Sequence, residues 1–277
     1  MATKGKQAKA VADAPKETVL VLRTCNANMM CCNGSSDHVP FQWPDQGPVE
    51  APDWKPTQEC GNGLHGLLWG EGDGSLLNWD ENAKWLVVEV EASTLIDLSG
   101  KVKFPRGIVM FVGSRDTATD YLKLHGGSGR TIVGGTATAG DSGTATAGYR
   151  GTATAGDSGT ATAWDRGTAT EGDSGTATAG YRGTATAGVS GTATAGYRGT
   201  ATAGYSGTAT AGDRGTATAG YRGTATAGYR GSATAGYSGS ATAGYSGTAT
   251  AGYRGTATAG DSGTATAGDS GTATAGY

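Results

Sequence analysis

The sequence predicts a mainly β protein, in which a small N-terminal α+β domain precedes a thin, two-sided β-solenoid of 16-residue coils. Octads of the form Gly-Thr-Ala-Thr-Ala-Gly-(Tyr/Asp)-(Arg/Ser) fill residues 135–277. Within them, Thr-Ala-Thr-Ala alternates side-chain type with the two-residue period of a strand. Leu, Val, Ile and Trp concentrate before about residue 134. We therefore expect a disordered leader over 1–16, a domain over 17–134 and the solenoid over 135–277, with two octads per coil.

The eighth position of the octad reveals the 16-residue period. In one set of alternate octads this position is serine in seven of nine copies, and in the other set it is arginine in six of eight. Two strands and two turns fit such a unit, because glycines at positions one and six give tight corners their backbone freedom. Nine coils at about 4.8 Å each predict a rod about 43 Å long.

The alternation also predicts which side chains face outward. Both alanines of a strand lie on one face and both threonines on the other. Burying a hydroxyl without a partner costs roughly 1–3 kcal/mol, so alanine should face inward and threonine outward. The result is a flat lattice of hydroxyls and methyls, in which Ser232 and Ser240 replace threonine. The predicted ligand- or ice-binding residues are Thr136, Thr138, Thr144, Thr146, Thr152, Thr154, Thr160, Thr162, Thr176, Thr178, Thr184, Thr186, Thr192, Thr194, Thr200, Thr202, Thr208 and Thr210.

The seventh position holds ten tyrosines, seven aspartates and Val189. Four of the tyrosines are consecutive along one edge and predict a stacked aromatic ladder, which either adds packing or forms a seam for self-association. The predicted self-association residues are Tyr205, Tyr221, Tyr237, Tyr253 and Tyr277.

Arginine at position eight forms a column from Arg150 to Arg230. We expect this column to be a solvated edge or, alternatively, an anion-binding row, with Asp165 and Asp213 relieving the like-charge repulsion. Trp164 and Glu171 break the consensus in adjacent octads, which indicates either a local contact or sequence drift.

The run "AGYRGTATAG" (Ala147–Gly156), with Thr152 and Thr154 on the Thr-x-Thr positions, resembles the tandem 16-residue repeats of bacterial ice-nucleation proteins. Several insect antifreeze solenoids use a similar Thr-x-Thr array. The resemblance implies a β-solenoid that binds or orders water or ice. This array is shorter than a nucleator's, its octad is more degenerate, and no distinct cap follows Tyr277. We therefore expect an open strand edge that invites self-association.

In the N-terminal part, strands are expected at 17–25, 84–91 and 107–113, and a short helix from an N-cap at Ser114 to Gly126. A Gly-, Pro- and Trp-rich loop region is expected between them, at 41–80. The runs "CGNGLHG" (Cys60–Gly66) and "KVKFPRG" (Lys101–Gly107) resemble a domain of unknown function from tailed-phage proteins. That resemblance implies a phage or prophage product and names no activity.

Candidate chemical residues in this domain are few. "GNGLHG" has a faint likeness to the glycine-rich stretch of ADP-ribosyltransferases, with His65 as the contact; the alternative is an ordinary loop histidine. Cys25, Cys31, Cys32, Cys60, His38 and His65 could offer zinc ligands, but their spacings match no ligand pair, and the question of metal stays open. The five tryptophans of the domain, Trp43, Trp54, Trp69, Trp79 and Trp85, are expected to form a small core. We predict no catalytic residue, no metal site and no cofactor.

The net charge of −3 argues against nucleic acid or anionic lipid as partners, and no run is apolar enough to cross a membrane. The N-terminus lacks the apolar region of a secretory signal, which favours a cytoplasmic or phage-particle location. The favoured function is a non-catalytic repeat protein whose Thr-x-Thr faces bind or order water or ice. A structural phage-related rod that self-assembles as a homo-oligomer is the alternative, and an N-terminal ADP-ribosyltransferase-like enzyme is the third.

Overall fold

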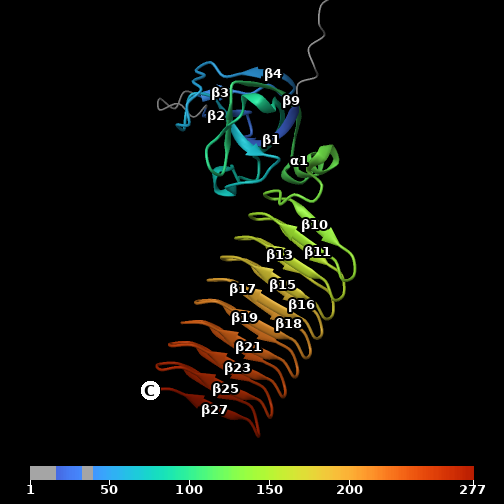
Figure 1. Cartoon of the computed structure of the whole chain (residues 1–277). Coiled ribbons are helices and arrows are strands. Elements are labelled where there is room, and N and C mark those ends of the chain that lie inside the picture. Colours follow the sequence, from blue (N-terminus) through green and yellow to red (C-terminus); the bar gives the residue numbers. More distant parts are fainter. Residues whose placement is uncertain (1–16, 33–39) are drawn as a thin grey trace, which may run out of the picture.

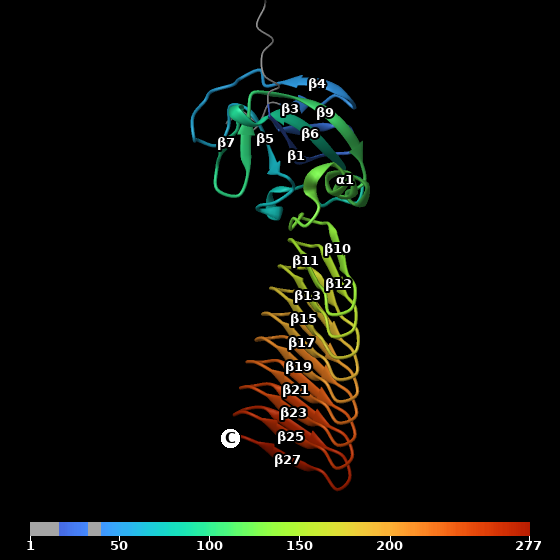
Figure 2. The ribbon, with the colours of Figure 1, turned by 45° about the vertical axis from the view of Figure 1, so that its right-hand side comes forward.

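A computed structural model describes residues 17–32 and 40–277, so the expected leader over 1–16 lies outside the described residues. Figures 1 and 2 show an N-terminal β domain followed by a rod of stacked coils, with the C-terminus at the far end. The chain is mainly β: 27 strands accompany one eight-residue α-helix in the described ranges. No helix in those ranges has the length and apolar character that a membrane crossing requires.

The domain is built on a seven-stranded antiparallel sheet with the order β4-β9-β6-β1-β5-β8-β7. Its long central strands are apolar on both faces, because each face of the sheet is covered and buried. A separate hairpin pairs β2 with β3. The strands are β1 (Thr18–Cys25), β2 (Met30–Cys32), β3 (Pro40–Gln42), β4 (Gly47–Glu50), β5 (Leu64–Leu68), β6 (Lys84–Glu91), β7 (Ile96–Asp97), β8 (Val102–Phe104) and β9 (Arg106–Gly113).

The two faces of this sheet carry two hydrophobic clusters. Val21 of β1 packs with Trp43 and Phe104 on one face, while Leu22 packs with Trp85 on the other. The expected tryptophan core is confirmed, because Trp43 and Trp85 are buried and the other three pack against the clusters. The expectation of a loop over 41–80 is wrong in part, since this region supplies β4, most of β3 and the buried strand β5.

The helix α1 (Arg115–Leu122) covers the Leu22 face and begins as expected, with the Ser114 hydroxyl accepting a hydrogen bond from the Thr117 amide. It continues as a π-helical turn, Lys123–Gly127, and Gly126 ends it at a φ of 112°. Short 3₁₀ turns lie at Gly74–Leu76 and Ala92–Thr94. Ile132 and Val133 then enter the same cluster, so the linker to the first coil is part of the domain core.

The predicted solenoid of 16-residue coils is confirmed. Each coil contributes one strand to each of two nine-stranded parallel sheets. The even sheet contains β10 (Thr136–Ala139), β12 (Thr152–Ala155), β14 (Thr168–Thr170), β16 (Thr184–Ala187), β18 (Thr200–Ala203), β20 (Thr216–Ala219), β22 (Ser232–Ala235), β24 (Thr248–Ala251) and β26 (Thr264–Ala267). The odd sheet contains β11 (Thr144–Ala147), β13 (Thr160–Ala163), β15 (Thr176–Ala179), β17 (Thr192–Ala195), β19 (Thr208–Ala211), β21 (Thr224–Ala227), β23 (Ser240–Ala243), β25 (Thr256–Ala259) and β27 (Thr272–Ala275).

Apart from Glu171, the core between the two sheets consists of alanine. The inward positions from Ala145 to Ala259 are almost completely buried and form one continuous cluster. A methyl group fills little space, so the two sheets can lie close together, and each coil gains little apolar burial of its own. Hydrogen bonds between successive coils run along every strand, so the coils stabilise one another as neighbours in a stack.

Corners connect the two sheets, and we number them by the order in which the chain reaches them. Corner column 1 comprises residues 140–143 and the equivalent four residues of each later coil, 16 positions further along. Corner column 2 comprises residues 148–151 and their equivalents in each later coil. In column 2 each eighth-position residue from Arg150 to Ser262 has a φ of 53–59°. Its amide donates to the seventh-position carbonyl of the next coil, as from Arg182 to Tyr197. This is the geometry of a type II turn.

Column 1 changes its turn type along the rod. Ser206 lacks the positive φ, and its amide donates to Val189 of the preceding coil. Arg222 and Ser238 repeat this pattern, whereas Arg254 returns to the type II form and donates to Asp269 of the next coil. One peptide flip per corner therefore reverses the direction of the hydrogen bonds along part of this edge.

Candidate functional site

Two faces of regularly spaced threonine run along the rod. Along each sheet, threonine lies over threonine in register, as in the pairs Thr192–Thr208 and Thr194–Thr210 of the odd sheet. The first threonine of each strand is exposed and the second is mostly half-buried. Strand geometry spaces them about 6.7 Å along the strand and about 4.8 Å between coils. All the predicted threonines lie in these rows, which continue to Thr272 and Thr274.

Glu171 interrupts the even sheet. It occupies an inward alanine position, is only 5% exposed and ends β14 one residue early. Its carboxylate accepts hydrogen bonds from the amides of Gly175 (2.7 Å) and Gly188 (3.2 Å). Burial raises the pKa of this carboxyl, and the nearby carboxylates of Asp157 and Asp173 raise it further. The departure from consensus at Glu171 is therefore a specific internal contact.

Stacked tyrosines follow both edges of the rod. In corner column 1, the ring centroids of Tyr205, Tyr221, Tyr237 and Tyr253 lie 4.8–5.0 Å apart, which confirms the predicted ladder. In column 2, the pairs Tyr181–Tyr197 and Tyr229–Tyr245 are 5.6 Å apart. In column 1, where the rings are closer together, Tyr205, Tyr221 and Tyr237 lie at the corners with the flipped peptide. The rings of Tyr237 and Tyr253 are tilted by 32°, at the point where Arg254 returns to the type II turn. Tyr277 is fully exposed on the final coil.

The arginine column lies on corner column 2. Arg166, Arg182, Arg198, Arg214 and Arg230 are exposed, while Arg150 is half-buried. Asp165 and Asp213, which are expected to relieve the repulsion between these arginines, make other contacts. Their carboxylates accept hydrogen bonds from the amides of Tyr181 and Tyr229 in the next coil, at 3.0 and 2.9 Å, and form no ion pair with the column.

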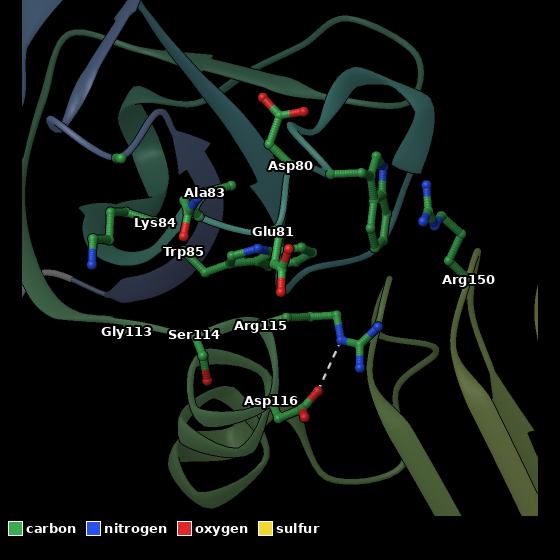
Figure 3. A pocket seen from close by; sticks show the side chains of 13 residues that line it. Asp80, Glu81, Ala83, Lys84, Trp85, Gly113, Ser114, Arg115, Asp116 and Arg150 are labelled. Carbon is green, nitrogen blue, oxygen red and sulfur yellow. Dashed lines mark hydrogen bonds and ion pairs between the residues drawn. The ribbon is translucent and has the colours of Figure 1, made fainter.

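A cleft of about 620 Å³ lies where the domain meets the first coil. Figure 3 shows Arg115 and Arg150 reaching toward the same side of it, with Lys84 and Glu81 on its walls. The Arg150 guanidinium lies 4.3 Å from the ring centroid of Trp79, and the Tyr149 ring packs on the same tryptophan at 5.7 Å. The backbone carbonyl of Tyr149 also accepts a hydrogen bond from the amide of Gly134. Together these contacts fasten the first coil to the domain.

Trp164 stands on a second hollow, of about 460 Å³, beside this junction. It replaces a corner glycine and is 48% exposed. Gly72 and Gly74 of the domain also line this hollow. Trp164 therefore stands beside the domain at the top of the odd sheet.

His65 lies on the buried strand β5, so its assignment to a loop is wrong. Burial lowers its pKa to about 4, helped by the positive charges of Lys101, Arg23 and Lys103. The exposed Cys60 thiol accepts a hydrogen bond from the Lys101 ammonium at 3.0 Å. The histidine is thus a neutral buried side chain beside cations.

Zinc ligands do not converge in the part of the chain that the structure describes, where no three Cys, His, Asp or Glu side chains form a metal-binding group. Cys25 is buried in the domain core, whereas Cys60 is exposed. His38 and the side chains of Cys31 and Cys32 lie outside the described residues.

The first part of the chain matches a known family model. Residues 19–121 match the family described as "Domain of unknown function (DUF7666)". The match spans the sheet from β1 to β9 and nearly all of α1, and its description assigns no activity. No solved structure matches the chain.

The chain is also similar to ice nucleation proteins. It is 45% identical over 108 residues to one from Xanthomonas campestris pv. translucens, a match that covers 38% of this chain and 6% of that protein. The corresponding protein of Pseudomonas fluorescens is 45% identical over 108 residues, covering 38% and 8%. Ice nucleation protein InaU of Pantoea ananas is 40% identical over 112 residues, covering 40% and 10%.

These matches extend over a tenth or less of the length of each relative. Together with the 16-residue coils, they show an ice-nucleation-like repeat protein.

Proposed function

We propose that this is a non-catalytic protein whose threonine faces bind ordered water and ice. The observation that carries the proposal is the register of threonine over threonine across two nine-stranded sheets, in which only Ser232 and Ser240 replace an outward threonine. Similarity to proteins named for ice nucleation supports it.

The physical basis is preorganisation. Each outward threonine presents a hydroxyl that can hold a water molecule beside a methyl group that restricts where water can lie. Strand hydrogen bonds and the packed alanine core fix these groups before any ligand arrives, so little conformational freedom remains to be lost on binding. A surface that repeats about every 4.8 Å along the rod holds a layer of waters with the same repeat.

The test replaces Thr192 and Thr194 with lysine in the middle of the odd sheet. Two long charged side chains would break the flat lattice, so ice shaping, recrystallisation inhibition and the droplet freezing temperature should fall toward buffer values. Ser190→Lys together with Ser206→Lys adds the same charge at exposed corners and should retain the activity. An intact wild-type protein that leaves ice growth and droplet freezing unchanged would refute the proposal.

A second candidate function is a self-associating rod, favoured by the tyrosine ladder of corner column 1. Tyr205, Tyr221 and Tyr237 stack on one another yet stay 40–51% exposed, so their outer edges are available to a second copy. Electron microscopy and sedimentation would show paired or filamentous rods, which Tyr205→Ser with Tyr221→Ser should disperse. Monomers at every concentration would exclude this candidate.

A further inference from the structure

The arginine edge presents a straight row of positive charge. Five consecutive coils of corner column 2 each place one exposed arginine at the eighth position, from Arg166 to Arg230. Successive coils are about 4.8 Å apart, which is less than the Debye length of about 10 Å at 0.1 M salt. Neighbouring guanidinium groups therefore act on a ligand together.

This charge is poorly compensated by the protein itself. Six corners of column 2 carry six arginines and only two aspartates, Asp165 and Asp213, and both carboxylates are engaged by backbone amides. One arginine contacts a neighbour by hydrogen bond, from Arg214 Nη1 to the Tyr197 hydroxyl at 3.4 Å. Within the described residues, no ion pair involves this column.

The fold does not require arginine at these positions. Ser246 and Ser262 occupy the same corner with the same positive φ, and their amides make the same bond to the next coil. Corner column 1 differs in charge: it carries Asp141, Asp157 and Asp173 in its first three coils. The cationic row is thus confined to one edge.

The domain ends this row. Arg150 is held against Trp79, and the adjoining cleft contains Asp80, Glu81 and Asp116 as well as Lys84 and Arg115. Because this cleft contains both carboxylates and cations, it has no preference for an anionic ligand. The accessible row therefore runs from Arg166 to Arg230, about 19 Å over four intervals.

We propose that this edge binds an extended acidic polysaccharide. A linear chain with carboxylates at regular intervals can meet one guanidinium per coil, and its hydroxyl groups can hydrogen-bond to the tyrosine hydroxyls of the same edge. The rings of Tyr181 and Tyr197 are parallel within 2° and stack on each other, as do those of Tyr229 and Tyr245. These inner ring faces are closed to nucleobases, whose stacking on aromatic rings is a main source of affinity for single-stranded nucleic acid.

The test measures binding of the full chain to oligogalacturonate, a carboxylated polysaccharide, with neutral dextran as the uncharged control. Arg182→Gln with Arg198→Gln should weaken binding about tenfold at low salt and reduce the dependence of log K on log salt by about two. Arg182→Lys with Arg198→Lys retains the charge and should bind nearly as wild type does. The matched control, Arg222→Gln with Arg254→Gln, removes two exposed arginines from the opposite edge and should change little. Circular dichroism verifies that each variant is folded.

Each other outcome overturns the proposal. Absence of binding, or an equal loss in the control variant, shows that the row is a solvated edge. Binding of poly(dT) with equal affinity and the same arginine dependence assigns the edge to nucleic acid. Sedimentation that reveals salt-sensitive self-association, lost in the Arg182→Gln/Arg198→Gln variant, assigns it to the acidic corner of a second copy. The ice-binding assays are independent of all three results.

Discussion

The spacing between stacked coils can be tested by adding one methyl group at a corner. Gly199 is the corner residue that directly precedes β18 and has no positive φ, so alanine can adopt its backbone conformation. A Cβ atom built there would lie 2.8 Å from the Ala195 Cβ, 2.9 Å from the Gly183 carbonyl oxygen and 3.0 Å from the Gly196 carbonyl oxygen. Both oxygens already accept backbone hydrogen bonds, from Thr200 and from Gly199 itself.

The expected loss follows from these contacts. None of the three atoms can rotate away, because two belong to the backbone and the third is a methyl in the buried core. Overpacking of this kind costs about 1–3 kcal/mol. It outweighs the roughly 0.4–1 kcal/mol that a glycine-to-alanine change gains by restricting the unfolded chain. Gly199→Ala should therefore lower the free energy of unfolding by about 1–2 kcal/mol.

Urea unfolding and hydrogen exchange at the neighbouring coils are the appropriate measurements, because a stack of repeats can open locally. Gly140→Ala is the control, since nothing lies within 4 Å of a Cβ at that corner of the first coil. It should be neutral or slightly stabilising. Equal stability of the two variants would contradict the close contacts of Gly199, both those within its own corner and the one to the Gly183 carbonyl oxygen of the preceding coil.

Two predictions concern buried titratable groups. The pKa of Glu171 is raised by burial, so the stability that it contributes is complete below its unfolded pKa and is lost as pH rises through the higher folded value. Glu171→Ala should therefore stabilise the rod at pH 7, by about 0.5–2 kcal/mol, with an advantage that shrinks in acid; a pH-independent difference would contradict this. The pKa of His65 is lowered to about 4 by burial, so stability is lost as pH falls from 6.5 to about 4, by up to about 3 kcal/mol. His65→Gln should flatten that part of the stability profile, and an unchanged profile would show that His65 is accessible to protons in the folded state.

Several elements could be predicted from local pattern alone. The strand Lys84–Glu91 and the Ser114 cap agree with the predicted residues, because strand periodicity and capping are local properties. The strand β5 was missed, since "LHGLL" contains a glycine and a histidine that are unusual in a buried strand. Gly66 is required there, because a Cβ would lie 2.6 Å from the Leu22 carbonyl oxygen of the paired strand. The strand β1 approaches Gly66 only in the folded protein.

The sequence by itself determined the 16-residue coil, the inward alanines and the outward threonines, because all three follow from a period of two within a strand and from the cost of burying a hydroxyl. Only the tertiary structure decided what the variable positions do. The carboxylates of Asp165 and Asp213 lie nearer to the amides of the next coil than to any arginine, and Glu171 finds two amides inside the core. The turn type at each corner depends on which neighbouring coil accepts its hydrogen bond. Apart from the local bond between Glu171 and Gly175, these choices involve residues 15 to 17 positions apart, whose distances exist only once the coils are stacked.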